Sequence, residues 1–374
     1  MTAAVRVKGA KRTNVDWFLL GLRVFLLGLL AFGFFAFVWQ QIDNQNPLAR
    51  TINPDATGLT ADQIKGLLVT GLSQGAMYGL IALGYSMVYG VLGFINFAHG
   101  EVFMLGAFSG FITSTKFEQA GLWEDAFLFS VIVSVLVAVL VSTVAAVVIE
   151  KVAYRPLRGS PRLIPLITSI GVSFFIQNAV IVLFSPGAKS YPRLPDYLST
   201  RYDILTFQVE GVRILVLVVA ALSMAGLWMF VERTKTGKAM RAVAEDREIA
   251  ALMGIDVNRT IVTTFAVGGA MAGVAGILWG LLFRSVIAMT GFLPGIKAFT
   301  AAVVGGVGNL GGAMAGGVGL GGAEALAPLI LLEPIGINGA SQLRDAVVFV
   351  LLILVLLIKP TGIFGERLSS EDRA

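Results

Sequence analysis

Three polar side chains that could do chemistry lie close together in an otherwise apolar segment, GFINFAHGEVFMLGAF, at residues 93–108. Asn96, His99 and Glu101 could hydrogen-bond a polar solute, and the histidine and the carboxylate could also exchange a proton or bind a metal ion. A lone histidine followed two residues later by a glutamate is, however, neither an acid–base motif nor a metal-binding motif. His99 is the only histidine, and the chain has no cysteine. We therefore predict no catalytic residue, no metal site and no cofactor.

The composition predicts that this segment lies in a membrane. Hydrophobic residues make up 56% of the 374 residues and charged residues only 14%, whereas soluble proteins carry roughly 25% charged residues. Apolar runs of about 20 residues can cross a bilayer. Such runs lie at 17–39, 64–91, 94–114, 126–149, 163–184, 213–231, 260–283 and 311–332, with shorter runs at 297–308 and 343–358. We expect an all-α, polytopic integral membrane protein with about 8–10 transmembrane helices, some of them broken or short and rich in glycine.

The distribution of lysine and arginine predicts which loops face the cytoplasm. Basic residues cluster before the first predicted span, at Arg6, Lys8, Lys11 and Arg12, and in the loops at 150–162 and 232–259. The loops at 40–63, 115–125 and 185–212 carry less net positive charge and are predicted to lie outside. The net charge of +5 thus reflects cytoplasmic loops, and we expect no nucleic-acid binding.

Several polar residues in the predicted spans have three possible roles. An ionisable group within a span costs about 2.5–3.5 kcal/mol on insertion scales, so it usually has a partner or a function. These residues could form a structural hydrogen-bond network, line a translocation path, or be hydrated at the membrane boundary. Beside Asn96, His99 and Glu101, the candidates are Ser73, Gln74, Gln177, Asn178 and Glu324.

The chain has no phosphate-binding loop of the pattern G-x-x-x-x-G-K-[ST]. Its single Gly-Lys pair, Gly237-Lys238, is followed by Ala239, and Glu232 stands where the first glycine should be. We therefore predict that the chain is not an enzyme. If ATP drives it, ATP is hydrolysed by separate subunits.

The loop at 232–259 is long for a connection between two membrane helices. Good helix formers from Lys238 to Met253 predict a helix, and Gly254 is a natural stop. Apolar residues recur at near-helical spacing along it. This pattern fits a helix that lies on the membrane surface as well as one that docks a cytoplasmic partner.

A resemblance to ABC importer permeases favours the docking role. Their cytoplasmic coupling loop has the pattern Glu-Ala-Ala, three residues, then Gly, and the segment EIAALMGI resembles it, with Ile249 in place of the first alanine. The resemblance implies that the coupling residues are Glu245, Glu248, Ala250 and Gly254. Segments at 78–108, 152–178, 237–255, 291–317 and 351–365 resemble, in order, those of branched-chain amino acid ABC permeases of the LivH type.

The resemblance covers about residues 62 to 365 and implies a domain organisation and a function. It implies a permease domain at 61–365 that contains the coupling loop at 232–259, a C-terminal tail at 366–374, and an N-terminal extension at 1–60 with one extra transmembrane helix. Such permeases lie in the bacterial inner membrane, in contact with lipid. They pair with a second related permease and work with two cytoplasmic ATP-binding subunits and a periplasmic substrate-binding protein. The resemblance implies alternating-access import of Leu, Ile or Val.

Two alternatives stay open. The same mechanism could serve urea, short amides or other amino acids, which permeases of this family also carry. A self-sufficient secondary transporter or channel would instead need intramembrane acids for coupling, and Glu101 and Glu324 are the candidates. The Gly- and Asn-containing breaks at 90–108 and 305–324 also resemble each other, as discontinuous helices in matching halves of transporters do.

Overall fold

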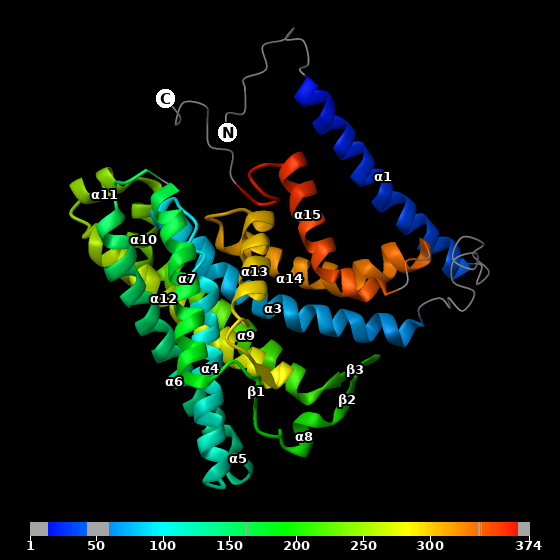
Figure 1. The fold of residues 1–374 in the computed structure, drawn as a ribbon, viewed down its shortest axis with the longest axis horizontal. Coiled ribbons are helices and arrows are strands. Elements are labelled where there is room, and N and C mark those ends of the chain that lie inside the picture. Colours follow the sequence, from blue (N-terminus) through cyan, green and yellow to red (C-terminus); the bar gives the residue numbers. More distant parts are fainter. Residues whose placement is uncertain (1–13, 43–59, 162, 336, 338, 366–374) are drawn as a thin grey trace. The chain divides into compact units, whose positions relative to one another are not determined.

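The computed structural model describes residues 14–42, 60–161, 163–335, 337 and 339–365 (Figure 1). The basic residues before the first span and the predicted tail at 366–374 lie outside the described residues. The chain forms two compact units. The larger unit takes in the described residues of Ala61–Leu326 and Thr361–Ala374, and the smaller unit those of Met1–Thr60 and Ala327–Pro360.

Eight helices among the described residues are long and apolar enough to cross a membrane, which confirms the predicted polytopic architecture. They are built on α1 (Asn14–Ile42), α3 (Ala61–Leu92), α6 (Phe127–Ile149), α7 (Leu163–Phe184), α9 (Gly211–Arg233), α12 (Val257–Phe283), α14 (Leu310–Ala327) and α15 (Arg344–Ile358). Short π- or 3-10 turns adjoin three of them: η1 (Glu150–Tyr154), η2 (Arg155–Leu157), η3 (Pro328–Leu332), η4 (Glu333–Ile335) and η5 (Ala340–Leu343).

Two predicted spans differ from the helices that form. The run at 94–114 becomes α4 (His99–Gln119), because residues 93–98 are not helical and Gly93, at φ +72°, ends α3 in a left-handed conformation. The run at 297–308 becomes α13 (Phe292–Gly305), a helix of 14 residues. At 1.5 Å per residue such a helix is about 21 Å long, shorter than the hydrocarbon core of about 30 Å. Neither helix is among the eight candidate spans.

The core of the larger unit is built around α12, which packs against α6, α4 and α3. Glycines bring these helices close together. A Cβ at Gly273 of α12 would lie 2.7 Å from the carbonyl oxygen of Ala138 on α6. On α3, Cβ atoms at Gly71 and Gly75 would each lie 2.8 Å from a carbonyl oxygen of α14. Small residues at these crossings allow the backbones to touch, as is common in membrane proteins.

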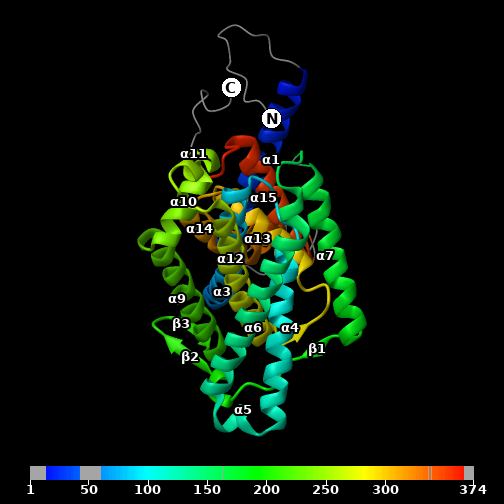
Figure 2. The same ribbon diagram turned by 90° about the vertical axis from the view of Figure 1, so that its left-hand side faces the viewer.

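The two ends of the larger unit carry different small elements (Figures 1 and 2). At one end lie α5 (Leu122–Asp125), α8 (Asp196–Ser199) and the antiparallel hairpin of β2 (Arg201–Ile204) and β3 (Phe207–Glu210). A second short pair joins β1 (Lys189–Ser190) to β4 (Ser285–Val286). At the opposite end lie α10 (Lys235–Glu245) and α11 (Arg247–Leu252), in the loop predicted to be cytoplasmic.

The smaller unit packs α1 against α15 and against the π-helical turn η3. A Cβ at Gly33 would lie 2.9 Å from the Cα of Leu331, so this glycine sets the close approach of the two segments. The outer face of α1 is apolar and exposed, as expected for a helix that faces lipid.

Candidate functional site

The break between α3 and α4 is tied to the rest of the larger unit through Asn96. The Asn96 side chain is buried, and its Oδ1 accepts a hydrogen bond of 2.5 Å from the hydroxyl of Tyr154 in η1. Its backbone oxygen accepts a bond from the amide of His99, the first residue of α4. Asn96 therefore holds an irregular segment in place at the end of two helices.

The side chain of His99 lies against α3. Its ring makes an edge contact with that of Tyr85, with centroids 4.9 Å apart. A Cβ at Gly84 would lie 2.6 Å from His99 Cε1, so the imidazole fits only because residue 84 is a glycine. Within the described residues, His99 Nε2 has no hydrogen-bond partner. The side chains of Asn96 and His99 thus do not hydrogen-bond to each other.

Glu101 is hydrogen-bonded to α7 and is only 1% exposed. Its Oε1 accepts bonds from Ser173 Oγ at 3.0 Å and from Gln177 Nε2 at 2.7 Å. Its Oε2 has no partner in the part of the chain that the structure describes. Gln177 therefore joins Glu101, whereas Asn178 is exposed and donates to the carbonyl of Phe174 on its own helix.

A cavity of about 280 Å³ lies beside this carboxylate. Its walls come from α3, α4, α7, α13 and the break before α4. The lining side chains are Tyr85, Phe97, Glu101, Ile170, Ser173, Phe174, Phe292 and Ile296. A small, mainly apolar cavity lined by one carboxyl-bearing and two hydroxyl-bearing residues can hold a small solute that has a polar head and an apolar body.

A second buried polar cluster joins α13 to α14. Lys297 Nζ lies 2.8 Å from Glu324 Oε1, and both side chains are less than a tenth exposed. The same ammonium group lies 6.0 Å from the centroid of the Tyr78 ring on α3. Lys297 was not among the predicted site residues because it begins an apolar run and resembles a span boundary. A second charge of opposite sign at Glu324 was the signal that could have identified the pair.

Ser73 and Gln74 lie on α3. Among the described residues, neither side chain hydrogen-bonds to Glu101 or to the Lys297–Glu324 pair. Ser73 is fully buried and donates to the carbonyl oxygen of Val69 one turn earlier. Gln74 is 8% exposed, and its Oε1 has no partner among the described residues. The structure places Gln74 one helical turn before Tyr78, which faces Lys297.

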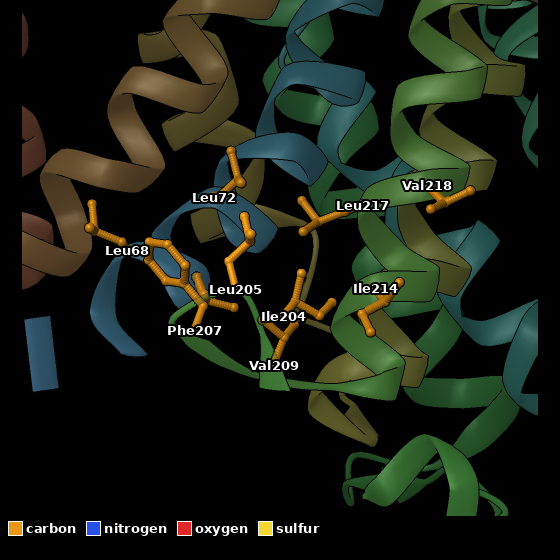
Figure 3. A pocket seen from close by; sticks show the side chains of 10 residues that line it. Leu68, Leu72, Ile204, Leu205, Phe207, Val209, Ile214, Leu217 and Val218 are labelled. Atoms are coloured by element: carbon orange, nitrogen blue, oxygen red, sulfur yellow. The ribbon is translucent and has the colours of Figure 1, made fainter. Parts of the chain in front are cut away.

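A larger cavity of about 450 Å³ lies between α3, α9 and the β2–β3 hairpin (Figure 3). All ten lining side chains are apolar: Leu68, Val69, Leu72, Ile204, Leu205, Phe207, Val209, Ile214, Leu217 and Val218. Without a polar lining group, this cavity cannot orient a zwitterion or a polar solute. It fits an apolar occupant such as a lipid chain.

The loop at 232–259 forms two helices where the sequence predicted a single helix from Lys238 to Met253. Asp246 separates them in an extended conformation, and its Oδ1 caps α11 by accepting from the amides of Glu248 and Ile249 at 2.8 and 2.9 Å. A capping aspartate competes with helix continuation, which explains the break. Gly254 ends the region at φ +84°.

The predicted coupling residues differ in how exposed their side chains are. Glu245 and Glu248 are exposed, whereas Ala250 is 3% exposed and packs inward. Three apolar side chains of the same turn face away from the unit. These are Ile249, Leu252 and Met253, which are 58%, 86% and 78% exposed.

Arg247 connects α11 to the end of α3, a contact that the sequence did not predict. Its Nε and Nη2 donate to the carbonyl oxygen of Val91 at 2.9 and 2.5 Å. Val91 lies in the last turn of α3, directly before the break that contains Asn96. Partial burial, and to a smaller extent the charge of Arg158, lower the pKa of Arg247 from its usual value.

Comparison with known proteins identifies the family. The family described as "Branched-chain amino acid transport system / permease component" matches residues 67–356. The high-affinity branched-chain amino acid permease protein BraD of Pseudomonas aeruginosa is 44% identical over 301 residues, which cover 80% of this chain and 95% of that protein. LivH of Escherichia coli is 40% identical, with 80% and 94% covered.

A more distant relative is the fructose import permease protein FrcC of Rhizobium meliloti. It is 31% identical over 159 residues, which cover 40% of this chain and 42% of that protein. The family match begins within α3 and ends within α15. The chain therefore belongs to the family of permease components of branched-chain amino acid transport systems.

Proposed function

We propose that this chain imports branched-chain amino acids across a bacterial inner membrane by alternating access, as the permease subunit of an ABC importer. The observation that carries the proposal is its identity of 44% and 40%, over 80% of the chain, with permeases named for these substrates. Permeases of this kind are non-catalytic membrane subunits, so other polypeptides must hydrolyse ATP.

The full assembly that we propose contains a second related permease, two cytoplasmic ATP-binding subunits and a periplasmic substrate-binding protein. The docking helix for an ATP-binding subunit is α11. Its exposed Ile249, Leu252 and Met253 provide an apolar surface, and Glu245 and Glu248 supply charge at its edge. A short helix that presents apolar side chains suits a groove on a partner.

We propose that Arg247 transmits movement of α11 to the membrane helix α3. A shift of α11 pulls on the Val91 carbonyl and so on the end of α3. The adjacent break at 93–98 is held by Asn96 and followed by His99. Irregular segments of this kind can change conformation at lower cost than a continuous helix.

The candidate path runs past the buried polar groups of the larger unit. We assign Glu101, Gln177 and His99 to its α3–α4–α7 side, and Glu324, with Ser73 and Gln74 on α3, to its α14 side. Breaks in helices often mark a transport site, and the breaks at 93–98 and 306–309 support this assignment. Both adjoin α3, since Ser86 on α3 accepts a hydrogen bond of 2.9 Å from the amide of Gly308 in the second break. We also propose that residues 61–365 are the permease domain and 1–60 an extension.

Two alternatives differ in cargo or in energy source. The same mechanism could carry urea, short amides or other amino acids, and the relative FrcC is named for fructose. A self-sufficient secondary transporter would need an acid free to titrate. Glu324 already pairs with Lys297, which leaves Glu101 for that role.

Uptake by the complete complex in proteoliposomes tests the cargo. The chain is reconstituted with its partner subunits, and labelled leucine and labelled urea are offered separately through the binding protein. We expect uptake of leucine, with unlabelled isoleucine and valine as competitors. Uptake of urea without uptake of leucine would contradict the proposed cargo.

A further inference from the structure

We propose that the cavity beside Glu101 is the site in this chain that binds the ammonium group and the branched side chain of the transported amino acid. This inference rests on the proposed function and extends it to a specific site. The first reason is the state of the Glu101 carboxylate. It is 1% exposed and hydrogen-bonded only at Oε1, by the neutral donors Ser173 and Gln177.

The second oxygen of Glu101 calls for a positively charged ligand. Oε2 has no partner among the described residues, and no lysine or arginine forms an ion pair with this carboxylate there. An ionised carboxylate that is buried without a cation is strongly unfavourable. The other two buried acids of the unit have a cation each, Arg158 for Glu150 and Lys297 for Glu324. Glu101 therefore lacks a cation, and a solute that carries one would stabilise the ionised carboxylate.

The backbone of α13 packs directly against the Glu101 carboxylate. A Cβ at Gly291 would lie 2.7 Å from Glu101 Oε2, so a glycine is needed where α13 begins. A Cβ at Gly295 would lie 2.9 Å from the Cα of Gly100. These glycines bring α4 and α13 together at the carboxylate, where Phe292 and Ile296 of α13 line the cavity.

The walls of the cavity fit the rest of the ligand. Phe97, Phe174 and Phe292 supply aromatic surface, and Ile170 and Ile296 supply aliphatic surface. Apolar walls bury a branched side chain, and aromatic faces also attract an ammonium group. At about 280 Å³ the cavity is near the lower end of ligand pockets, which range over about 300–1,000 Å³. A small aliphatic amine fits a carboxylate surrounded by apolar walls, whereas urea and sugars have no positive charge to pair with Glu101.

Substitution of Glu101 tests the site by direct binding. Thermal unfolding of the purified complex is followed with leucine, with isopentylamine, which lacks the carboxylate of leucine, and with 4-methylpentanoate, which lacks the ammonium group. In the unmodified complex, we expect leucine and isopentylamine to raise the Tm and 4-methylpentanoate to have no effect. In Glu101→Gln, we expect both increases to be lost.

Two further variants separate loss of charge from loss of fold. Glu101→Asp keeps the charge and should retain part of the Tm increase. Glu118→Gln removes an exposed carboxylate from the same helix and should behave as the unmodified complex. For leucine uptake, we expect Glu101→Gln to lower kcat/KM by about tenfold or more, the loss expected for one charge-assisted hydrogen bond.

The outcomes distinguish this inference from the proposed function. Equal Tm increases in Glu101→Gln and in the unmodified complex, or no increase with either amine, would overturn the ammonium site. Import of urea in place of leucine by the unmodified complex would instead overturn the proposed cargo, and it is measured in a separate assay.

Discussion

At the scale of single residues, the buried acids Glu101 and Glu324 of the larger unit are compensated in different ways. Glu324 pairs with Lys297 at 2.8 Å, whereas Glu101 has only the neutral donors Ser173 and Gln177. A buried ion pair fixes the relative position of the two helices that carry it. A carboxylate with neutral donors stays available to a cationic solute.

The ion pair gives a prediction about stability. Lys297→Met should lower the free energy of unfolding by about 3–5 kcal/mol, because Glu324 is left buried without its cation. The double variant Lys297→Met, Glu324→Gln should recover much of that loss, because no charge is then unpaired. Denaturant unfolding in detergent measures both. Equal stability of the single and double variants would contradict the structural role of the pair.

The polar residues selected from the sequence are buried except for Asn178, but their partners were not predicted. Glu101 and Gln177 lie 76 positions apart and bond to each other, and Tyr154, which bonds Asn96, was not foreseen at all. Contacts between distant helices depend on helix rotation and crossing angle, which one sequence does not reveal. Asn178 was predicted as buried, but a rotation of one position from Gln177 places it on the exposed face.

At the scale of elements, the crossing of α3 and α14 depends on glycine. A Cβ at Gly75 would lie 2.8 Å both from the carbonyl oxygen of Gly317 and from the Cα of Val318. These are backbone atoms, so they can move only if a helix moves. Gly66, on the same helix, has open space around its Cβ position.

This difference predicts opposite effects for two similar substitutions. Gly75→Ala should destabilise the protein by about 1–3 kcal/mol, the usual range for overpacking. Gly66→Ala should be neutral or stabilise it by about 0.4–1 kcal/mol, because alanine restricts the unfolded chain. Unfolding midpoints of the two variants give the comparison. A stable Gly75→Ala protein would mean that α3 and α14 are not packed so closely.

A second prediction at this scale concerns the contact between Arg247 and Val91. Arg247→Gln removes the charged double contact with α3 but leaves the exposed docking side chains of α11 unchanged. We expect ATP hydrolysis by the complex to continue while leucine uptake per ATP falls several-fold. The matched control is Arg241→Gln, which removes an exposed ion pair with Glu232. Such pairs contribute about 0–1 kcal/mol, so uptake should hardly change. Equal coupling in both variants would rule out Arg247 as the link.

Helices were predicted well where their apolar runs were long and less well where a capping residue intervened. The run at 163–184 has the same bounds as α7, since nothing within it interrupts the pattern. The loop helix was predicted as one piece because the cap at Asp246 lies among charged residues that also suit a helix. The short α13 shows a further difficulty, because apolar composition alone does not separate a spanning helix from a shorter one.

At the scale of the whole molecule, a permease component is one part of a larger transport system. The chain lacks a phosphate-binding loop of the pattern G-x-x-x-x-G-K-[ST], and α11 lies at the end of the larger unit opposite the β2–β3 hairpin. Membership of this permease family implies partner transporter subunits.

The most direct test of that claim is accumulation of labelled leucine against a concentration gradient in proteoliposomes. The complete complex is compared with ATP, with a non-hydrolysable ATP analogue, and with this chain alone. We predict accumulation above the external concentration only for the complete complex with ATP. Accumulation with the analogue, or by this chain alone, would contradict the assignment as an ATP-driven permease subunit.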